Sequence, residues 1–268
     1  AVHNAPYLAL LVNAVEPFAA ASAGLDHVHL VEGTKIYGSH LGPFKTPAKE
    51  SDPPHMLPNF YWDQERWLEG FQRGKGWSFS VLRPQTVCGF ALGNPMNLAV
   101  GLAVYATISK ELGLQLRFPG SATAYRKLYQ VTDSELLAEC MLWCATTPAA
   151  RNGIFNITNT DFFRWENLWP GFARAFGLEP GGVQTIRLAE VMADKGPLWA
   201  DMQRRHGLRP IPYDQLVSWP FVDYCLTRDY DVMSDTLKIR KAGFTACVDS
   251  EAMLLRLFDE LRAMRVIP

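Results

Sequence analysis

Three short runs in the first part of the chain are apolar, or alternate between apolar and polar residues, over the length of a β-strand. They are Asp26–Val31, Trp77–Leu82 and Ile154–Ile157. Gly33 and Pro84 follow the first two runs, and both residue types favour turns. The pattern therefore predicts three strands.

Between and after these runs, apolar residues recur at spacings of three and four, the period of an amphipathic helix. Asn59 and Asp133 precede two such segments and can cap the free N–H groups of a first helical turn. The predicted helices cover residues 4–23, Asn59–Arg73, Met96–Leu112, Asp133–Ala145, Trp165–Phe176, Leu188–His206, Pro212–Leu226 and Ser250–Met264.

Strands and helices thus alternate along residues 1–160, whereas residues 161–268 are mainly helical. Alternation of this kind favours an α/β fold, in which helices cover both faces of a parallel sheet. The long connection between the first strand and the Asn59 helix contains five prolines, and loops of this length are often functional.

Composition narrows the class of protein. The 268 residues are 48% hydrophobic and 20% charged, with a net charge of −1, which excludes disorder and argues against nucleic-acid binding. Five scattered cysteines indicate reduced thiols and a cytoplasmic protein. The apolar runs Ala5–Val15 and Pro95–Ser109 are shorter than the ~18–20 residues of a membrane helix, so we expect no membrane partner.

A doubly wound nucleotide-binding domain normally opens with a strand and a G-x-G-x-x-G turn, and the chain contains no such motif. It begins in a predicted helix and without an initiator Met, and its α/β pattern matches the second half of such a domain. We therefore expect the first βαβ units to be absent from this sequence, and the isolated chain to bind a dinucleotide weakly.

Two side chains follow the predicted first strand and open the next helix. Lys35, in the turn Gly33-Thr-Lys-Ile-Tyr-Gly38, comes at the carboxyl end of a strand, where open α/β sheets bind ligands. Tyr61 lies in Asn59-Phe-Tyr, but the residue four positions later is Glu65, and no Tyr-x-x-x-Lys pair occurs in the chain. On spacing alone, Lys35 could equally be a solvated loop residue and Tyr61 a half-buried packing residue, without a catalytic role.

Other candidate residues have ordinary structural interpretations. Cys140 and Cys144 lie four apart on an apolar helix stripe without a further pair of ligands, so we expect core packing and no metal site. His27 and His29 alternate on a predicted strand, which favours a structural role.

Taken together, several motifs resemble the progesterone 5β-reductase/iridoid synthase-like family of atypical extended short-chain dehydrogenases/reductases. The resemblance runs from about Asn4 to the carboxyl terminus. Its matching stretches are Gly33–Gly38, Gly42-Pro-Phe44, Asp52-Pro-Pro54, Asn59-Phe-Tyr61 with Asp63 and Glu65, Arg83-Pro84, Gly89-Phe90, Met96-Asn-Leu98, Asp133–Trp143 and Trp219–Phe221.

The resemblance implies a Rossmann-type dinucleotide-binding domain over 1–160, with 90–130 contributing to the substrate side, and a mainly helical substrate-binding region over 161–268. It implies that Lys35 and Tyr61 are catalytic and contact the cofactor NADPH. The turn beside the nicotinamide corresponds to Pro84, Thr86 and Val87, with Gln85-Thr86 where the plant pattern has Gly-Asn. Phe44 and Phe221 match two walls of an apolar substrate pocket.

The function implied is NADPH-dependent reduction of the C=C bond of a small apolar enone, with the tyrosine stabilising the enolate. Two alternatives stay open: a nucleotide-sugar epimerase or dehydratase of the same superfamily, and a non-catalytic NADP(H)-binding sensor. The first normally requires the Tyr-x-x-x-Lys pair, and the second needs neither Lys35 nor Tyr61. A homodimer is an assembly that the chain could form.

Overall fold

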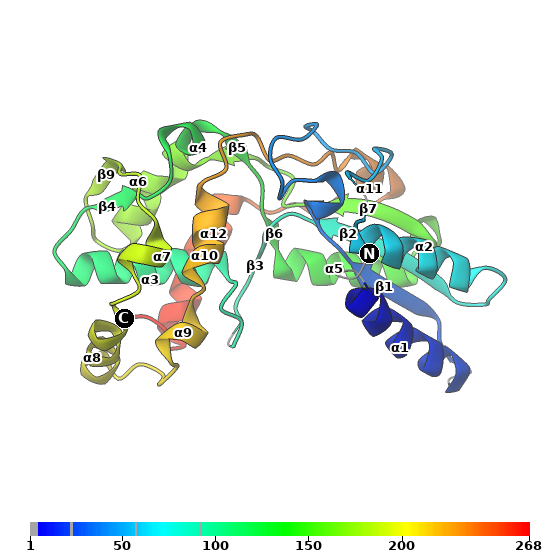
Figure 1. Cartoon of the computed structure of the whole chain (residues 1–268), viewed down its shortest axis with the longest axis horizontal. Coiled ribbons are helices and arrows are strands. Elements are labelled where there is room, and N and C mark those ends of the chain that lie inside the picture. The colour runs from blue at the N-terminus through cyan, green and yellow to red at the C-terminus, as the bar shows by residue number, and fades with distance from the viewer. Residues whose placement is uncertain (1–4, 22–23, 57, 92) are drawn as a thin grey trace. The chain divides into compact units, whose positions relative to one another are not determined.

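The computed structural model describes residues 5–21, 24–56, 58–91 and 93–268, so Asn4 and residues 22 and 23 of the predicted first helix lie outside the described residues. The described chain forms two compact units, each assembled from three segments (Figure 1). The first unit contains the described residues of Ala1–Gln85, Glu135–Thr160 and Met233–Cys247. The second contains those of Thr86–Ser134, Asp161–Val232 and Val248–Pro268.

A parallel three-stranded sheet forms the centre of the first unit. Its strands are β1 (His27–Val31), β2 (Ser78–Pro84) and β7 (Gly153–Ile157), in the order β1-β2-β7. All three predicted strands are confirmed, and β2 continues two residues further than the alternation indicates. Because the strands are parallel, their carboxyl ends meet at one edge of the sheet.

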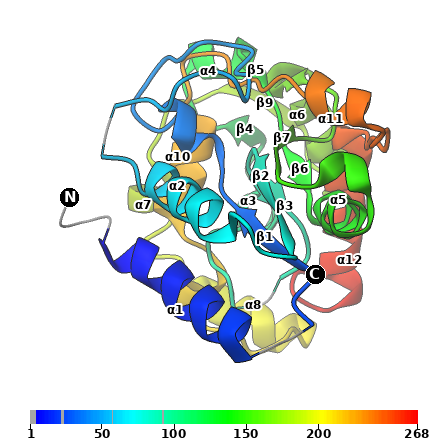
Figure 2. The same ribbon diagram turned by 90° about the vertical axis from the view of Figure 1, so that its right-hand side faces the viewer.

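Successive side chains of β2 point to opposite faces of the sheet and contact different helices there. Phe79 and Val81 pack with Leu68 of α2 (Phe60–Gln72), whereas Ser80 on the other face contacts Cys144 of α5 (Ser134–Thr146). Figure 2 shows α2 and α5 on opposite sides of the sheet. The prediction of helices on both faces is therefore confirmed.

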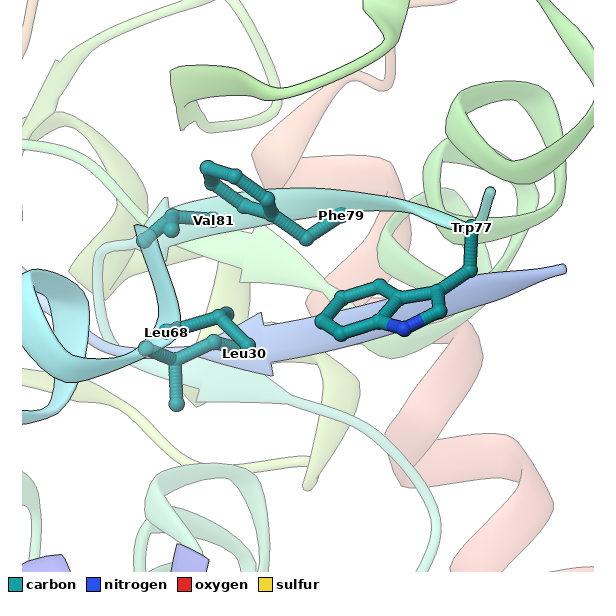
Figure 3. Packing of buried hydrophobic residues seen from close by; sticks show 5 residues of the cluster. All are labelled: Leu30, Leu68, Trp77, Phe79 and Val81. Carbon is teal, nitrogen blue, oxygen red and sulfur yellow. The ribbon is translucent and has the colours of Figure 1, made fainter. Parts of the chain in front are cut away.

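The core between the sheet and α2 consists of large apolar side chains. Leu30 of β1 and Phe79 and Val81 of β2 gather with Trp77 and Leu68 (Figure 3). Leu68 has no exposed surface. The unit also contains α1 (Ala5–Ala21), which packs on α2, the 3₁₀ helices η1 (Thr34–Tyr37) and η2 (Pro148–Ala150), and α11 (Leu237–Ala242).

The second unit is mainly helical, with a core of aromatic rings. Trp169 of α6 (Trp165–Ala175) stands edge-on to Phe118 and Phe172, and Phe172 meets Phe258 of α12 (Ser250–Ala263). The unit also contains the long helix α3 (Leu98–Glu111) and the short helix α4 (Ala122–Arg126). Rings of this size bury large apolar areas, so they supply much of the unit's hydrophobic stabilisation.

Two predicted helices of this unit are each divided in two. Leu188–His206 forms α7 (Leu188–Val191) and α8 (Gly196–His206), and Pro212–Leu226 forms α9 (Tyr213–Leu216) and α10 (Trp219–Leu226). Pro197 and Pro220 lie in the first turns of α8 and α10. Proline has no N–H to donate, so it suits the start of a helix and interrupts a longer one.

Short two-stranded ladders were not predicted. They pair β3 (Val87–Cys88) with β6 (Thr132–Asp133), β4 (Leu116–Phe118) with β9 (Pro180–Val183), and β5 (Leu128–Tyr129) with β8 (Phe163–Arg164). The described residues of segment 90–130 lie in the second unit. The division at residue 160 into a dinucleotide-binding and a substrate-binding domain stays a prediction.

All five cysteines are free thiols. Among the helices of the described ranges, none has both the length and the apolar character that a membrane span requires. Within the same ranges, no three histidine, cysteine or acidic side chains are grouped closely enough to hold a metal ion.

Replacing the fully buried Leu68 tests the packing of α2 on the sheet. Leu68→Ala leaves a cavity that rigid neighbours fill incompletely, so we expect unfolding to require about 2–5 kcal/mol less free energy, measured by urea titration. The control is Leu142→Ala, at a position on α5 that is 67% exposed, with an expected change of about 0.5 kcal/mol or less. Equal effects of the two substitutions would contradict the packing described.

Candidate active site

The turn that carries Lys35 is fixed to the carboxyl ends of β1 and β2. The amide of Glu32 donates to the Leu82 carbonyl at 2.8 Å, so pairing continues one residue beyond β1. Thr34 then hydrogen bonds through its hydroxyl to both Ser39 and Gln85. Lys35 therefore projects from a turn held at the edge of the sheet where Rossmann-like proteins bind ligands.

Gly38 ends this turn because no larger residue fits there. Its φ is +79°, a left-handed conformation that side chains disfavour, and a Cβ at this position would overlap the His55 ring. The amide of His55 donates to the Ile36 carbonyl at 2.9 Å. The long loop therefore folds back onto the Lys35 turn.

Asn59 joins the Lys35 turn to the helix that carries Tyr61. Its side-chain oxygen accepts from the amide of Tyr61 at 3.1 Å, which caps α2, and its side-chain nitrogen donates to the Lys35 carbonyl at 3.1 Å. Asn59 is 8% exposed. One amide side chain thus connects the backbones of the two candidate catalytic residues.

The Tyr61 hydroxyl lies at the same edge of the sheet as the Lys35 turn. A Cβ built on Gly33 would be 3.6 Å from the Tyr61 hydroxyl and 3.6 Å from the Pro84 carbonyl oxygen. Tyr61 and Phe44 also pack together with buried Ile36 in one apolar cluster. The structure therefore brings Lys35, Tyr61, Pro84 and Phe44 into one region of the first unit.

Two cavities open in the first unit, one lined in part by Lys35 and the other in part by Phe44. One, of about 310 Å³, is lined by Lys35, His40 and Leu41 together with His55 and Asn59, among others. The other, of about 460 Å³, is lined by Tyr37, Phe44, Lys45, Asp52 and His55, among others. Both volumes lie within the ~300–1,000 Å³ typical of small-molecule sites.

The remaining predicted site residues belong to the second unit. Thr86 has a left-handed φ of +23°, and its hydroxyl hydrogen bonds to that of Tyr129 at 2.9 Å. Val87 is 39% exposed in β3, and Phe221 lies half-buried in α10. A non-glycine residue held at positive φ costs conformational free energy, so the Tyr129 contact helps to hold the turn in this form.

Sequence reasoning missed a buried ionic cluster in the first unit, next to the Lys35 turn. Arg83 donates to Glu32 at 3.1 Å, to Tyr37 at 2.9 Å and to Glu65 at 2.5 Å. All four residues are buried. Charged residues that follow the apolar cores of two predicted strands, Glu32 after Val31 and Arg83 after Leu82, were the available signal.

The cluster has two carboxylates for one guanidinium, and this imbalance shifts their protonation. Burial and the charge of Glu65 raise the pKa of Glu32 to about 8, despite the opposing effect of Arg83. Burial also raises the pKa of Glu65. One oxygen of Glu32, Oε1, has no hydrogen-bond partner among the described residues. The raised pKa of Glu32 favours its protonated form at neutral pH.

The chain is similar to a known protein family over its whole length and to individual members of known activity. A family model described as "PRISE-like Rossmann-fold domain" matches residues 1–268. (S)-8-oxocitronellyl enol synthase from Nepeta cataria is 35% identical over 275 residues, covering 97% of this chain and 68% of the relative. 3-Oxo-Δ4,5-steroid 5β-reductase from Arabidopsis thaliana is 32% identical over 278 residues, covering 99% and 70%.

The solved structure of RMD from Pseudomonas aeruginosa, complexed with NADPH, superposes with a TM-score of 0.61 at 15% identity. The match covers 92% of this chain and 69% of that one, and at this identity it speaks for the fold alone. Together with the family match, it confirms the Rossmann-type α/β fold.

The raised pKa of Glu32 makes the free energy of unfolding depend on pH. From its ordinary pKa of 4.5 up to about 8, folded Glu32 binds more protons than in the unfolded chain. Its contribution to stability is thus fully present below pH 4.5 and is lost as the pH rises through 8. We expect Glu32→Gln to weaken this decline, measured as unfolding free energies between pH 5 and 9. An equally steep decline in both proteins would place the proton elsewhere.

Proposed function

Because the chain belongs to the family of PRISE-like Rossmann-fold domains, we propose that it reduces the C=C bond of α,β-unsaturated carbonyl compounds with NADPH. The chain is an NAD(P)H-dependent oxidoreductase of the short-chain dehydrogenase/reductase superfamily. The observation that carries the proposal is the meeting of the Tyr61 hydroxyl with the Lys35 turn and the end of β2.

The residues at the ends of β1 and β2 fit the nicotinamide end of such a cofactor. Gly33 has no side chain, and a Cβ built there would lie 3.6 Å from both the Tyr61 hydroxyl and the Pro84 carbonyl oxygen, so these two polar groups lie next to one another at the ends of the strands. A glycine-rich turn for the diphosphate is absent from this sequence. When bound, NADPH supplies the hydride that adds to the β-carbon of the enone.

Tyr61 acts on the oxygen of the substrate in this proposal. As the C=C bond is lost, its electron pair moves through the α-carbon to the carbonyl oxygen, where negative charge develops. The Tyr61 hydroxyl donates a hydrogen bond to that oxygen, and the ammonium of Lys35 strengthens the phenol as a donor. Protonation of the enolate from water at the α-carbon then completes the saturated ketone.

An apolar substrate fits the surroundings of Tyr61. Phe44, Ile36 and Ala48 form the cluster against which its ring packs, and Phe44 also lines the larger cavity. This apolar side would bind the hydrocarbon part of an enone, while Lys45, Asp52 and His55 make the rest of the larger cavity polar. A steroid, a monoterpenoid and a simple cyclic enone all have this character.

The residue four positions after Tyr61 also favours this activity over an epimerase. Glu65 is buried in an ion pair with Arg83, so the position that holds lysine in Tyr-x-x-x-Lys enzymes holds an anion turned into the core. The lysine proposed to assist Tyr61 comes from a different segment, the Lys35 turn.

Removing the Tyr61 hydroxyl tests the proposal. Using protein expressed from its complete coding sequence, NADPH oxidation is followed at 340 nm with 2-cyclohexen-1-one. Tyr61→Phe is expected to lower kcat about 10²- to 10³-fold, the effect of losing one donor to a developing oxyanion. The matched control, Tyr7→Phe, removes a hydroxyl from a half-exposed ring of α1 and is expected to leave kcat unchanged. Wild-type turnover in Tyr61→Phe would refute the role of Tyr61.

A further inference from the structure

Arg83 occupies the last position before Pro84, and its side chain points into the first unit rather than into solvent, with 2% exposure. Its guanidinium uses three nitrogens for three partners: Nε for Glu32, Nη1 for Tyr37 and Nη2 for Glu65. The planar fork of arginine suits such a set of contacts, whereas a lysine ammonium is a single point of charge.

The three partners lie on the segments that carry the proposed reaction residues. Glu32 directly precedes the Lys35 turn, and Tyr37 is the last residue of its 3₁₀ helix, so Arg83 contacts both ends of the helical part of that turn. Glu65 lies one helical turn beyond Tyr61 in α2. One cation therefore connects the end of β2, the Lys35 turn and the Tyr61 helix.

The same cluster continues into the long loop. The Tyr37 hydroxyl donates to Asn156 Oδ1 at 2.7 Å, and Asn156 Nδ2 donates to the carbonyls of Ala48 at 3.0 Å and Asp235 at 3.1 Å. The backbone amide of Asn156 donates to Glu50 at 2.8 Å. Through these bonds, the loop that bears Phe44 is connected to the same arginine.

Stability alone does not explain a buried charge cluster in this place. Removing charged groups from water costs several kcal/mol per ion, and apolar side chains of similar volume often stabilise a protein as well or better. Apolar side chains pack through dispersion contacts, which have no preferred direction and therefore do not fix the angles between three segments. Hydrogen bonds from one planar group do fix them.

We propose that Arg83 is a positioning residue, which through Glu32, Tyr37 and Glu65 sets the Lys35 turn and the Tyr61 helix in the mutual placement that reduction requires. The consequence for the reaction rests on the proposed function, whereas the coupling between the segments does not.

The first experiment measures the coupling without any substrate. Arg83→Lys keeps the positive charge but cannot hold all three partners in one plane. We expect the amides of Gly38 and Asp63, which hydrogen bond within the turn and in the first turn of α2, to exchange hydrogen about tenfold faster than in wild type. Glu65→Gln is the second variant, since it keeps the shape of the side chain.

Arg256→Lys is the matched control. Arg256 also lies between two carboxylates, Asp133 at 2.7 Å and Glu260 at 2.5 Å, but in the second unit. We expect its replacement to leave exchange at Gly38 and Asp63 unchanged. Exchange at these amides that is the same in Arg83→Lys, Glu65→Gln and Arg256→Lys would overturn the coupling.

The second experiment measures the consequence for the reaction. Misplacement of reacting groups by about 1 Å can cost up to about 100-fold, so kcat for 2-cyclohexen-1-one is expected to fall at least about tenfold in Arg83→Lys. The KM for NADPH is expected to stay near its wild-type value, and Arg256→Lys is expected to retain its kcat. A wild-type kcat in Arg83→Lys, or a rise in KM alone, would overturn the positioning role.

The two experiments separate the inference from the proposed function. If the wild-type protein reduces no enone, the proposed function fails, and exchange at Gly38 and Asp63 still decides whether Arg83 couples the two segments. If Arg83→Lys does not fold, Glu65→Gln decides by the same exchange and kinetic criteria.

Discussion

A single guanidinium, buried at the end of the middle strand of a parallel sheet, sets the arrangement of the candidate site. Arg83 hydrogen bonds to two carboxyl groups, Glu32 and Glu65, and burial raises the pKa of both. Removing one partner of a buried ion pair destabilises the folded protein by several kcal/mol, because the remaining charge is left without compensation. Arg83 is therefore stable in this position only while its partners stay in place. The segments that supply these partners therefore have little freedom to move independently.

The parallel sheet provides the place for this arrangement. Strands β1 and β2 run in the same direction, so the residues that follow them meet at one edge. There the side-chain amide of Asn59 hydrogen bonds to both the Lys35 carbonyl and the backbone amide of Tyr61. Gly33, which has no side chain, lies beside the Tyr61 hydroxyl. Hydrogen bonds of the Asn59 side chain position the backbones of the two candidate residues, and the buried ionic cluster holds the segments that carry them.

Much of this architecture was predictable from the sequence. Alternation identified β1, β2 and β7, and the Asn59 cap located the start of α2. Ladders of two to four residues escaped prediction, because so short a strand shows no period that distinguishes it from a loop. Likewise, the apolar period continued across Pro197 although the chain there ends one helix and begins another.

The candidate site was predictable only in part. Lys35 and Tyr61 were identified as candidate catalytic residues because their motifs resemble those of a known family, and their roles stay predictions. The role of Arg83 was not predictable, because its partners Glu32 and Glu65 lie 51 and 18 residues away and meet it only once the register of β1 against β2 is fixed. Local propensity carries no information on such pairings.

The most direct test of the central claim is a crystal structure of the protein, expressed from its complete coding sequence, with NADP⁺ and an enone bound. We expect the carbonyl oxygen of the enone to lie within hydrogen-bond distance of the Tyr61 hydroxyl, about 2.6–3.2 Å, with the β-carbon toward the nicotinamide. An enone whose carbonyl oxygen binds other groups, with Tyr61 and Lys35 remote from it, would show that these two residues do not act on the substrate.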